Sequence, residues 1–337
     1  MERVVLVGSG GFGRCWWPAL TRMPDRFEVV GVVEPDPAAR AAAGRHFDLA
    51  PDRLRAPGEF DWTAFGASLV IDSSPFPHHP AHLRRAVAAG LDVLVAKPMA
   101  PSLAEATEMV DRARAAGSRL AVAQQMRYFP CFLALRTLLA TRVAGDPVAV
   151  RVRMALDGRG WEPGTDWRLR MRHPLLFEAA IHHFDLLRWV FGTEFTDVAA
   201  LTWNPPWSPF TGDATAVVLM RGENGIGVDY SATFAPGAEP AVRFDSGWEV
   251  LCTDGTLTVR DGSVLLDNRV LHAAEAPDPV SLEELNTVVL REWATATLAR
   301  AEPAFNGADN LHSLALVEAA ARAADRSPRP VGTASPA

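Results

Sequence analysis

Three side chains in this sequence have the types and spacing needed to move a proton. Lys97 follows a short apolar run, and Glu178 and His182 are four residues apart, so that on a helix the carboxylate can orient the imidazole. An imidazole serves as a base near neutral pH, and burial beside another cation lowers the pKa of a lysine toward the range useful for proton transfer. Position alone equally allows a solvated surface lysine at 97, and spacing alone favours a core histidine at 182.

A dinucleotide fingerprint opens the chain. The apolar run 4–7 leads into Gly8-Ser9-Gly10-Gly11-Phe12-Gly13, which has the pattern G-x-G-x-x-G and precedes a predicted helix. The first glycine permits a tight turn, the second lets the backbone approach a pyrophosphate, and the third lets the helix pack on the strand. Because a helix N-terminus stabilises a diphosphate, we expect this segment to bind a cofactor through Gly8, Gly10, Gly11, Phe12 and Gly13.

A carboxylate completes the fingerprint. Glu34 ends a second apolar run, 28–33, and lies 21 residues after Gly13 (34 − 13). At this spacing a carboxylate accepts hydrogen bonds from both ribose hydroxyls and repels a 2′-phosphate, so NAD is the expected cofactor and NADP the minority interpretation. A glycine turn that binds nothing is the alternative, and the strand, helix and acid together disfavour it.

The elements that position these groups divide at about residue 125. Residues 1–125 alternate strand and helix signals, which predicts a doubly wound parallel sheet of the Rossmann type within an α/β chain. Residues 126–326 contain short alternating segments with Gly, Asp and Asn turns, which predict an α+β domain with an open, mainly antiparallel sheet. We expect the last helix, 310–326, to pack back on the first domain and residues 327–337 to form a loose tail.

Within this plan, each element has its own local signal. Strands are predicted at 4–7, 28–33, 68–72, 91–95, 119–123, 148–154, 214–220, 225–233, 248–252, 256–259 and 264–267. Helices are predicted at 14–20, 38–46, 78–89, 102–116, 129–142, 174–191, 281–301 and 310–326.

Composition limits the partners. The chain has 337 residues, too many for one ordinary core, and its net charge of −7 argues against a nucleic-acid or anionic membrane surface. No apolar run approaches the ~18 residues that span a bilayer, and the opening run lacks the plan of a signal peptide. Cys15, Cys131 and Cys252 form neither a disulfide framework nor a zinc pattern, so we expect a reducing cytoplasmic setting. No metal is expected, because no Cys or carboxylate ligands accompany the histidines at 78–82.

Further motifs follow the fingerprint and cover nearly the whole chain: Ser74-Pro75-x-x-x-His79, Ala86–Pro98, Gln125–Tyr128, Trp167-Arg168, Glu178–Trp189 and Asp309–Ala321. In their order and spacing, these segments resemble the glucose–fructose oxidoreductase, inositol dehydrogenase and MocA (Gfo/Idh/MocA) family of sugar and polyol dehydrogenases. Two positions depart from the family pattern. Ala96 replaces the glutamate of Glu-Lys-Pro, and Glu178 replaces the aspartate of Asp-x-x-x-His.

The resemblance implies an NAD-dependent oxidoreductase that transfers a hydride between the nicotinamide and a sugar, cyclitol or sugar-derived alcohol or ketone. It implies that His182 takes the hydroxyl proton, Lys97 polarises the oxygen and relays the proton, and Glu178 orients both. Further implied cofactor contacts are Ser74, Pro75, His79, Lys97, Gln125 and Arg168; implied substrate contacts are Lys97, Arg127, Glu178, His182 and His183. Structural salt bridges are the equal alternative for the two arginines, and the missing carboxylate at 96 is expected to weaken or reorient the cofactor.

Two other functions stay open. Some relatives retain NAD and oxidise a ring carbon only transiently, so that elimination, epimerisation or glycosidic cleavage follows without net redox. A cofactor-sensing regulatory protein has no need of the proton-transfer pair, which argues against that function. The open sheet face predicts a homo-oligomer.

Overall fold

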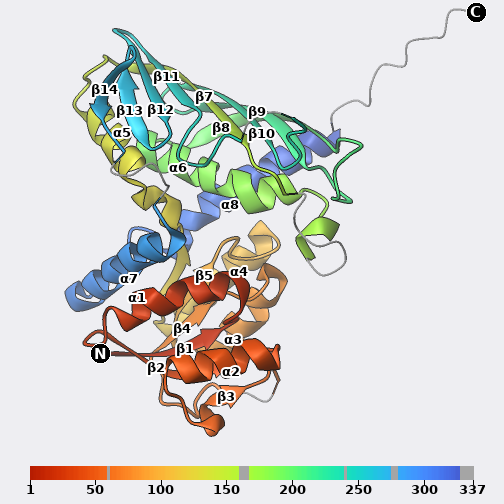
Figure 1. Ribbon diagram of the computed structural model, residues 1–337, viewed down its shortest axis with the longest axis vertical. Helices are drawn as coiled ribbons and strands as arrows, with labels where there is room; N and C mark the ends of the chain where they lie inside the picture. Colours follow the sequence, from red (N-terminus) through yellow and green to blue (C-terminus); the bar gives the residue numbers. More distant parts are fainter. Residues whose placement is uncertain (59–60, 159–166, 239–240, 275–279, 327–337) are drawn as a thin grey trace, which may run out of the picture. The chain divides into compact units, whose positions relative to one another are not determined.

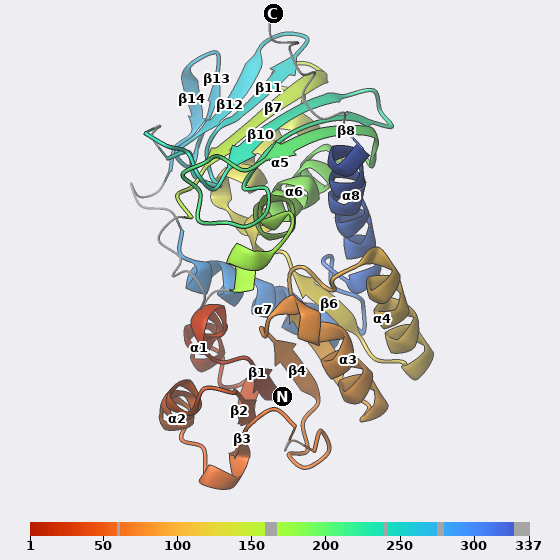
Figure 2. The same cartoon turned by 90° about the vertical axis from the view of Figure 1, so that its right-hand side faces the viewer.

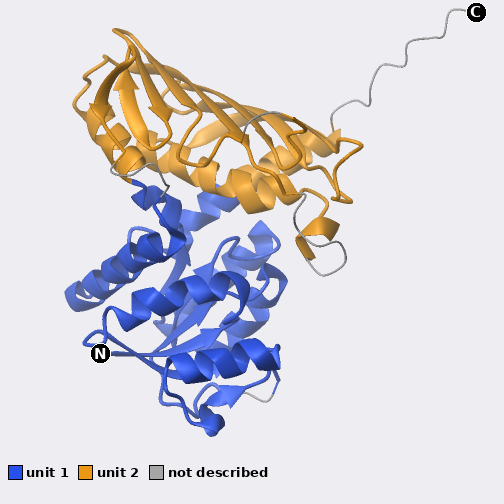
Figure 3. Ribbon diagram, viewed as in Figure 1, with its two compact units in different colours: residues 1–129, 278–315 blue, residues 130–277, 316–337 orange. Residues whose placement is uncertain are grey.

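Two compact units make up the protein in this computed structural model, which describes residues 1–58, 61–158, 167–238, 241–274 and 280–326. One unit comprises residues 1–129 and 278–315, and the other comprises residues 130–277 and 316–337 (Figure 3). The break near residue 129 is close to the division predicted at 125. The tail predicted at 327–337 lies outside the described residues.

A six-stranded parallel sheet forms the centre of the first unit, with the order β3-β2-β1-β4-β5-β6 (Figure 1). Its strands are β1 (Glu2–Val7), β2 (Phe27–Val33), β3 (Leu54–Arg55), β4 (Leu69–Asp72), β5 (Asp92–Ala96) and β6 (Leu120–Ala123). The chain builds outward from β1 in one direction and then, from β4, in the other. This is the predicted doubly wound sheet, and its topological switch point lies between β1 and β4. The two-residue β3 is too short to give a sequence signal.

Helices cover both faces of this sheet. They are α1 (Trp17–Thr21), α2 (Pro37–His46), α3 (His79–Ala88), α4 (Leu103–Ala116), α7 (Leu282–Ala299) and the first part of α8 (Gly307–Arg326). Because parallel crossovers are right-handed, α1 and α2 lie on one face and α3 and α4 on the other (Figure 2). Short 3₁₀ helices occupy Gly11–Trp16, Pro51–Arg53, Phe76–His78 and Gln125–Tyr128.

Two of the predicted helix starts are confirmed by their caps. The Asp36 carboxylate accepts hydrogen bonds from the N–H groups of Ala38 (3.1 Å) and Ala39 (3.0 Å), which starts α2. The Ser102 hydroxyl accepts one from the N–H of Glu105 (3.2 Å), which starts α4. These bonds satisfy N–H groups that the first turn of a helix otherwise leaves without partners.

Helix α7 belongs to the first unit, which differs from the sequence division, where 281–301 fell in the second domain. Val289, Leu290 and Trp293 are fully buried in one apolar cluster with Val4 and Leu6 of β1. The burial of this face is the physical reason that the chain returns to its first unit. The beginning of α8, as far as residue 315, is grouped with the first unit as well.

An eight-stranded sheet forms the second unit, with the order β14-β13-β12-β11-β7-β10-β9-β8. The strands are β7 (Pro147–Ala155), β8 (Phe195–Trp203), β9 (Thr215–Gly222), β10 (Gly227–Thr233), β11 (Trp248–Cys252), β12 (Thr256–Arg260), β13 (Ser263–Leu266) and β14 (Arg269–His272). All neighbours pair antiparallel except β7 and β10, which confirms the predicted, mainly antiparallel sheet. Strands β8 and β14 were not predicted from the sequence.

Helices α5 (Pro130–Ala140) and α6 (Ile181–Phe191), with the end of α8, lie on one face of this sheet (Figure 1). A 3₁₀ helix at Trp167–Arg170 and a π-helical turn at Leu176–Ala180 precede α6. The single helix predicted at 174–191 is therefore a π-helical turn followed by an α-helix. Among the described residues, no helix is both long enough and apolar enough to cross a lipid bilayer.

Candidate active site

The glycine turn and Lys97 lie at the same edge of the first sheet. Val7 pairs with Asp72, and Asp72 pairs with Val95, so the residues that follow these three strands leave the sheet at one level. Gly8 comes directly after β1 and Lys97 directly after β5. This is the carboxyl edge at which α/β sheets bind ligands.

Two glycines of the fingerprint stand where no other residue fits. A Cβ atom on Gly8, whose φ is +74°, would lie 2.6 Å from the backbone nitrogen of Ser74. A Cβ atom on Gly13 would lie 1.9 Å from the carbonyl oxygen of Gly8. The first glycine thus permits the turn and the approach of β4, and the last lets the following helix contact the turn, as the fingerprint predicts.

Glu34 is tied to the glycine turn by its side chain. Its Oε2 atom accepts hydrogen bonds from the N–H groups of Ser9 (2.7 Å) and Gly10 (3.0 Å), and Oε1 accepts one from the N–H of Asp36 (3.0 Å). A carboxylate has about four acceptor positions, so capacity remains for ribose hydroxyls. The Arg40 guanidinium donates a hydrogen bond to the backbone carbonyl oxygen of Glu34, so at least one of its donors has a partner within the protein.

Lys97 is the only lysine in the chain; the other 32 of the 33 basic Lys and Arg residues are arginines (33 − 1). Its side chain is partly buried, and the next residues, from Pro98 to Ala100, are buried. Arginine stays protonated in proteins, whereas lysine can release and regain a proton. The only primary amine side chain of the sequence is therefore at this position.

Several predicted contacts have protein partners of their own. His79 is 1% exposed, and both of its ring nitrogens face backbone carbonyl oxygens. Arg127 is buried, and its guanidinium donates to Asp309 (2.6 Å) and to the carbonyl of Ala304 (3.1 Å). The structural salt bridge considered for Arg127 is thus present. Its contact with substrate stays a prediction.

Gln125 offers an acceptor for a bound group. Its side chain is 2% exposed, and its Oε1 atom has no hydrogen-bond partner among the described residues. A buried acceptor left without a donor costs free energy, so this position is suited to a polar ligand.

In the second unit, Glu178 lies in the π-helical turn and His182 in the first turn of α6. A π-helical turn has an extra residue, so the shared face expected from α-helical spacing is rotated here. Such turns are frequent at functional sites. Arg168 donates from Nε to Oε2 of Glu178 at 2.9 Å, so the salt bridge considered for Arg168 is also present.

The two histidines of α6 have different surroundings. Both are buried, and Phe244 packs edge-on against His182 and stacks on His183 at a ring distance of 4.9 Å. Burial lowers the pKa of His183 to about 3, and its Nδ1 atom lies 3.3 Å from the Tyr230 hydroxyl. His183 is therefore neutral at physiological pH. No motif in the sequence pointed to Phe244.

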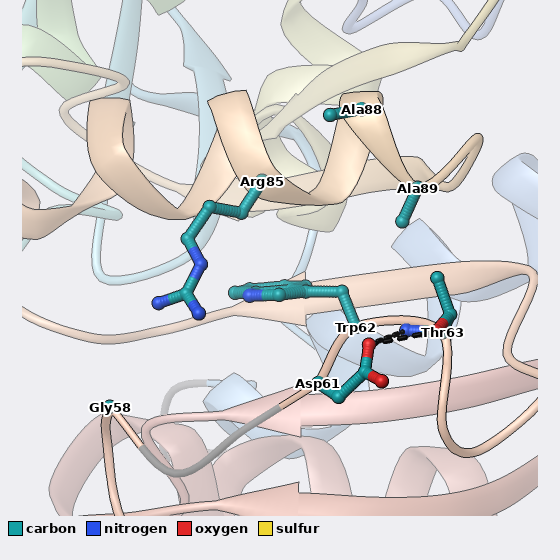
Figure 4. Close-up of a pocket in the computed structure, with 7 residues that line it drawn as sticks. All are labelled: Gly58, Asp61, Trp62, Thr63, Arg85, Ala88 and Ala89. Carbon is teal, nitrogen blue, oxygen red and sulfur yellow. Dashed lines mark hydrogen bonds between the residues drawn. The ribbon is translucent and has the colours of Figure 1, made fainter.

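A surface pocket in the first unit lies apart from these residues. Its lining consists of Gly58, Asp61, Trp62, Thr63, Arg85, Ala88 and Ala89 (Figure 4). The Arg85 guanidinium lies over the Trp62 ring, 6.0 Å from its centroid. None of the predicted site residues is in this lining. Helix α3 starts at the carboxyl edge, and Ala88 of the lining is at its opposite end.

Family models match both halves of the chain. Residues 2–124 match the model described as an oxidoreductase family with an NAD-binding Rossmann fold, and residues 132–258 match the C-terminal domain of GFO/IDH/MocA proteins. The chain belongs to the Gfo/Idh/MocA family. The resemblance in the sequence is thereby confirmed, and so is the NAD-binding fold of the first unit.

Individual Gfo/Idh/MocA proteins are similar along most of the chain. D-apiose dehydrogenase from Paraburkholderia graminis is 29% identical and covers 93% of this chain and 85% of its own length. Inositol 2-dehydrogenase from Streptomyces avermitilis is 27% identical, with coverages of 97% and 93%. A solved oxidoreductase from Agrobacterium radiobacter, in complex with NAD⁺, L-tartaric acid and magnesium, superposes with a TM-score of 0.83 at 20% identity, covering 96% of each chain, and shows the shared fold.

Proposed function

We propose that this Gfo/Idh/MocA protein is an NAD-dependent oxidoreductase that moves a hydride between the nicotinamide and a sugar, cyclitol or sugar-derived alcohol or ketone. The observation that carries the proposal is the placement of the only lysine of the chain, Lys97, at the carboxyl edge that also holds the glycine turn. The names of the similar dehydrogenases support the substrate class.

The residues of the first unit fit the cofactor. The Ser9 and Gly10 N–H groups already meet a carboxylate, which shows that this turn accommodates negative charge, and Gln125 has a buried acceptor without a partner. We place the dinucleotide against Gly8–Gly13, Glu34, Ser74, Pro75 and Gln125, with NAD favoured over NADP because Glu34 repels a 2′-phosphate. When bound, NAD supplies the hydride acceptor.

The protein's own groups handle the proton. In the oxidation direction His182 accepts the hydroxyl proton, while the Lys97 ammonium polarises the hydroxyl oxygen and relays the proton. Glu178 orients these groups, and Arg168 holds Glu178 through its 2.9 Å ion pair. In the reduction direction the same groups return the proton to the carbonyl oxygen.

A panel of polyols and sugars with NAD, followed at the NADH absorbance band, tests the proposal. We expect turnover with at least one member and a loss of 100-fold or more in Lys97→Arg and His182→Ala, with Arg84→Lys as the matched exchange at an exposed position. Near-wild-type hydride transfer in both site variants would overturn the assignment. Substrate loss without NADH would instead indicate transient oxidation with no net redox.

We also propose a homo-oligomer formed through the open face of the second sheet. Leu201 of β8 and Leu219 of β9 are 56% and 52% exposed, and their register places both on the same face. Large exposed side chains gathered on one face mark an interaction surface. Leu219→Glu is expected to lower the mass measured by light scattering to that of a single chain, while the wild type runs as an oligomer.

The cellular setting is part of the same proposal. Cys15, Cys131 and Cys252 are all free thiols. Unpaired thiols suit a reducing compartment, so we place the protein in the cytoplasm.

A further inference from the structure

We propose that His79 is a positioning residue that fixes the segment carrying Lys97, because its two ring nitrogens lie within hydrogen-bond distance of backbone carbonyl oxygens that follow β4 and β5. This proposal rests on the catalytic role proposed for Lys97. It replaces the expectation that His79 contacts the cofactor directly.

The geometry consists of one imidazole between two strand ends. Nε2 of His79 lies 2.8 Å from the carbonyl oxygen of Ser74, which follows β4. Nδ1 lies 3.0 Å from the carbonyl oxygen of Pro98 and 3.3 Å from that of Met99, in the segment that follows β5. His79 itself is in the first turn of α3. A single side chain thus joins α3 to the segments that follow β4 and β5, at the carboxyl edge of the sheet.

Carbonyl oxygens only accept hydrogen bonds, so each bond requires a hydrogen on the imidazole nitrogen. A neutral imidazole carries one such hydrogen and can satisfy one strand end. The ring is 1% exposed and the carbonyl oxygens are fixed by the backbone, so the imidazole is held between the two strand ends.

A counter-charge lies in the same cluster. Asp72, at the end of β4, is 2% exposed, and its carboxylate accepts from Ser74 (2.7 Å) and lies 2.9 Å from Nδ1 of His82. Burial opposes its charge, but His79, His82 and Ser74 outweigh burial and hold the pKa of Asp72 below its usual value. The charged and titratable groups near His79 are thus Asp72 at the end of β4 and His82 in α3. Lys97 precedes Pro98, whose carbonyl oxygen contacts His79.

The consequence for Lys97 is mechanical. Pro98 is the next residue after Lys97, and its carbonyl oxygen lies 3.0 Å from Nδ1 of His79. Ser74 packs closely on Gly8, because a Cβ atom on Gly8 would lie 2.6 Å from the backbone nitrogen of Ser74. His79 therefore links the backbone of the lysine to the backbone that packs on the glycine turn. Without the imidazole, the Lys97–Met99 segment loses its tie to β4, and the ammonium loses its set position at the cofactor edge.

The single lysine makes the test direct. In the full-length protein labelled with ¹³Cε,¹⁵Nζ-lysine, the side-chain signal belongs to Lys97 alone. We expect His79→Gln, which keeps one donor, to displace this signal by more than its linewidth, and His79→Ala to displace it further. His78→Gln, at the exposed neighbouring position, is the matched control and is expected to reproduce the wild-type signal. An unchanged Lys97 signal in a folded His79→Gln protein would overturn the proposal.

Two further measurements separate the possible roles. With NAD and an active polyol, His79→Gln is expected to lower kcat by 10-fold or more and to change the Kd for NAD by less than threefold. A weakened affinity for NAD with unchanged kcat would show a direct cofactor contact instead and overturn the positioning role.

The wild-type protein supplies the remaining test. Its ¹H–¹⁵N histidine spectrum is expected to show a slowly exchanging ring N–H signal for His79, and a ring N–H that exchanges freely with solvent would overturn the proposal even if the variants do not fold. These spectra need no turnover. A slowly exchanging His79 N–H and a displaced Lys97 signal in a protein that oxidises no sugar or polyol would support the positioning role and count against the proposed reaction.

Discussion

The Nε atom of Arg168 lies 2.9 Å from Oε2 of Glu178 and joins the 3₁₀ helix Trp167–Arg170 to the π-helical turn that precedes α6. The Glu178 side chain is only 9% exposed, so the guanidinium is its counter-charge within a largely dry site. A charge-assisted hydrogen bond of this kind holds the carboxylate in place.

Removing this guanidinium is expected to lower the rate of hydride transfer. We expect Arg168→Ala to reduce kcat by about 10- to 100-fold, the size of one charge-assisted hydrogen bond to a buried group. Stopped-flow measurement at the NADH band checks this, with Arg170→Ala, an exposed position on the same turn, as the control. Equal rates in the two variants would show that Arg168 does not serve the reaction.

The contact between Glu34 and the glycine turn predicts an effect on cofactor choice. Glu34→Gln keeps the shape but removes the charge that accepts from Ser9 and Gly10, so the Kd for NAD should rise by about 10-fold or more. Binding of NADP should suffer less, because the repulsion of its 2′-phosphate disappears. Calorimetric titration with both dinucleotides measures the ratio. Glu28→Gln, at an exposed position of β2, the strand that precedes Glu34, is expected to leave this ratio unchanged.

His183 predicts acid sensitivity of the fold. Its pKa is about 3 when folded and about 6.5 when unfolded, so between these values the unfolded chain binds the extra proton. The stabilisation is complete above about pH 6.5 and is lost as the pH falls toward 3, at up to about 1.4 kcal/mol per pH unit. Urea unfolding at pH 7.5, 6 and 5 should show a steeper fall for the wild type than for His183→Phe. Parallel curves would mean that His183 is accessible to protons in the folded state.

The capping box at the start of α7 is expected to stabilise the fold, because α7 packs on β1 through its buried face. The Ser281 hydroxyl accepts from the Glu284 N–H at 3.2 Å, and the Glu284 carboxylate accepts from the Ser281 N–H at 3.0 Å. Ser281→Ala should lower the free energy of unfolding by about 1 kcal/mol. Thr295→Ala, on the exposed side of the same helix, should change it by less than about 0.5 kcal/mol. Urea denaturation of both variants is the measurement.

Much of the first unit follows from local signals. Several features have a short-range physical cause, and the structure contains them nearly as predicted. They are the apolar strands before Gly8 and Lys97, the Asp36 cap of α2 and the end of α4 at Gly117. Strand β3, with two residues, and edge strand β14 carry too little periodic pattern to stand out from loops.

The site was less accessible to sequence reasoning. The π-helical turn at Leu176–Ala180 depends on one extra residue per turn, which periodicity over 174–191 does not resolve. Phe244, which packs on both histidines, comes from a connecting segment with no motif. The contacts of His79 with the carbonyl oxygens of Ser74 and Pro98 depend on where β4 and β5 end relative to each other. This register is a property of the folded sheet rather than of any stretch of sequence.

The return of α7 to the first unit has a consequence for biosynthesis. Val4 and Leu6 leave the ribosome almost at once, but Val289, Leu290 and Trp293, which complete their apolar cluster, are made after about 280 further residues. Domains commonly fold in the order in which they are translated, and here the first domain to be started cannot be the first to be finished. The sheet of the second unit, β7 to β14, lies in the sequence between these two parts and can close earlier, so nascent chains should expose the β1 surface to chaperones until translation has passed α7. A truncation before residue 282 should accordingly yield a protein that aggregates rather than an isolated nucleotide-binding domain.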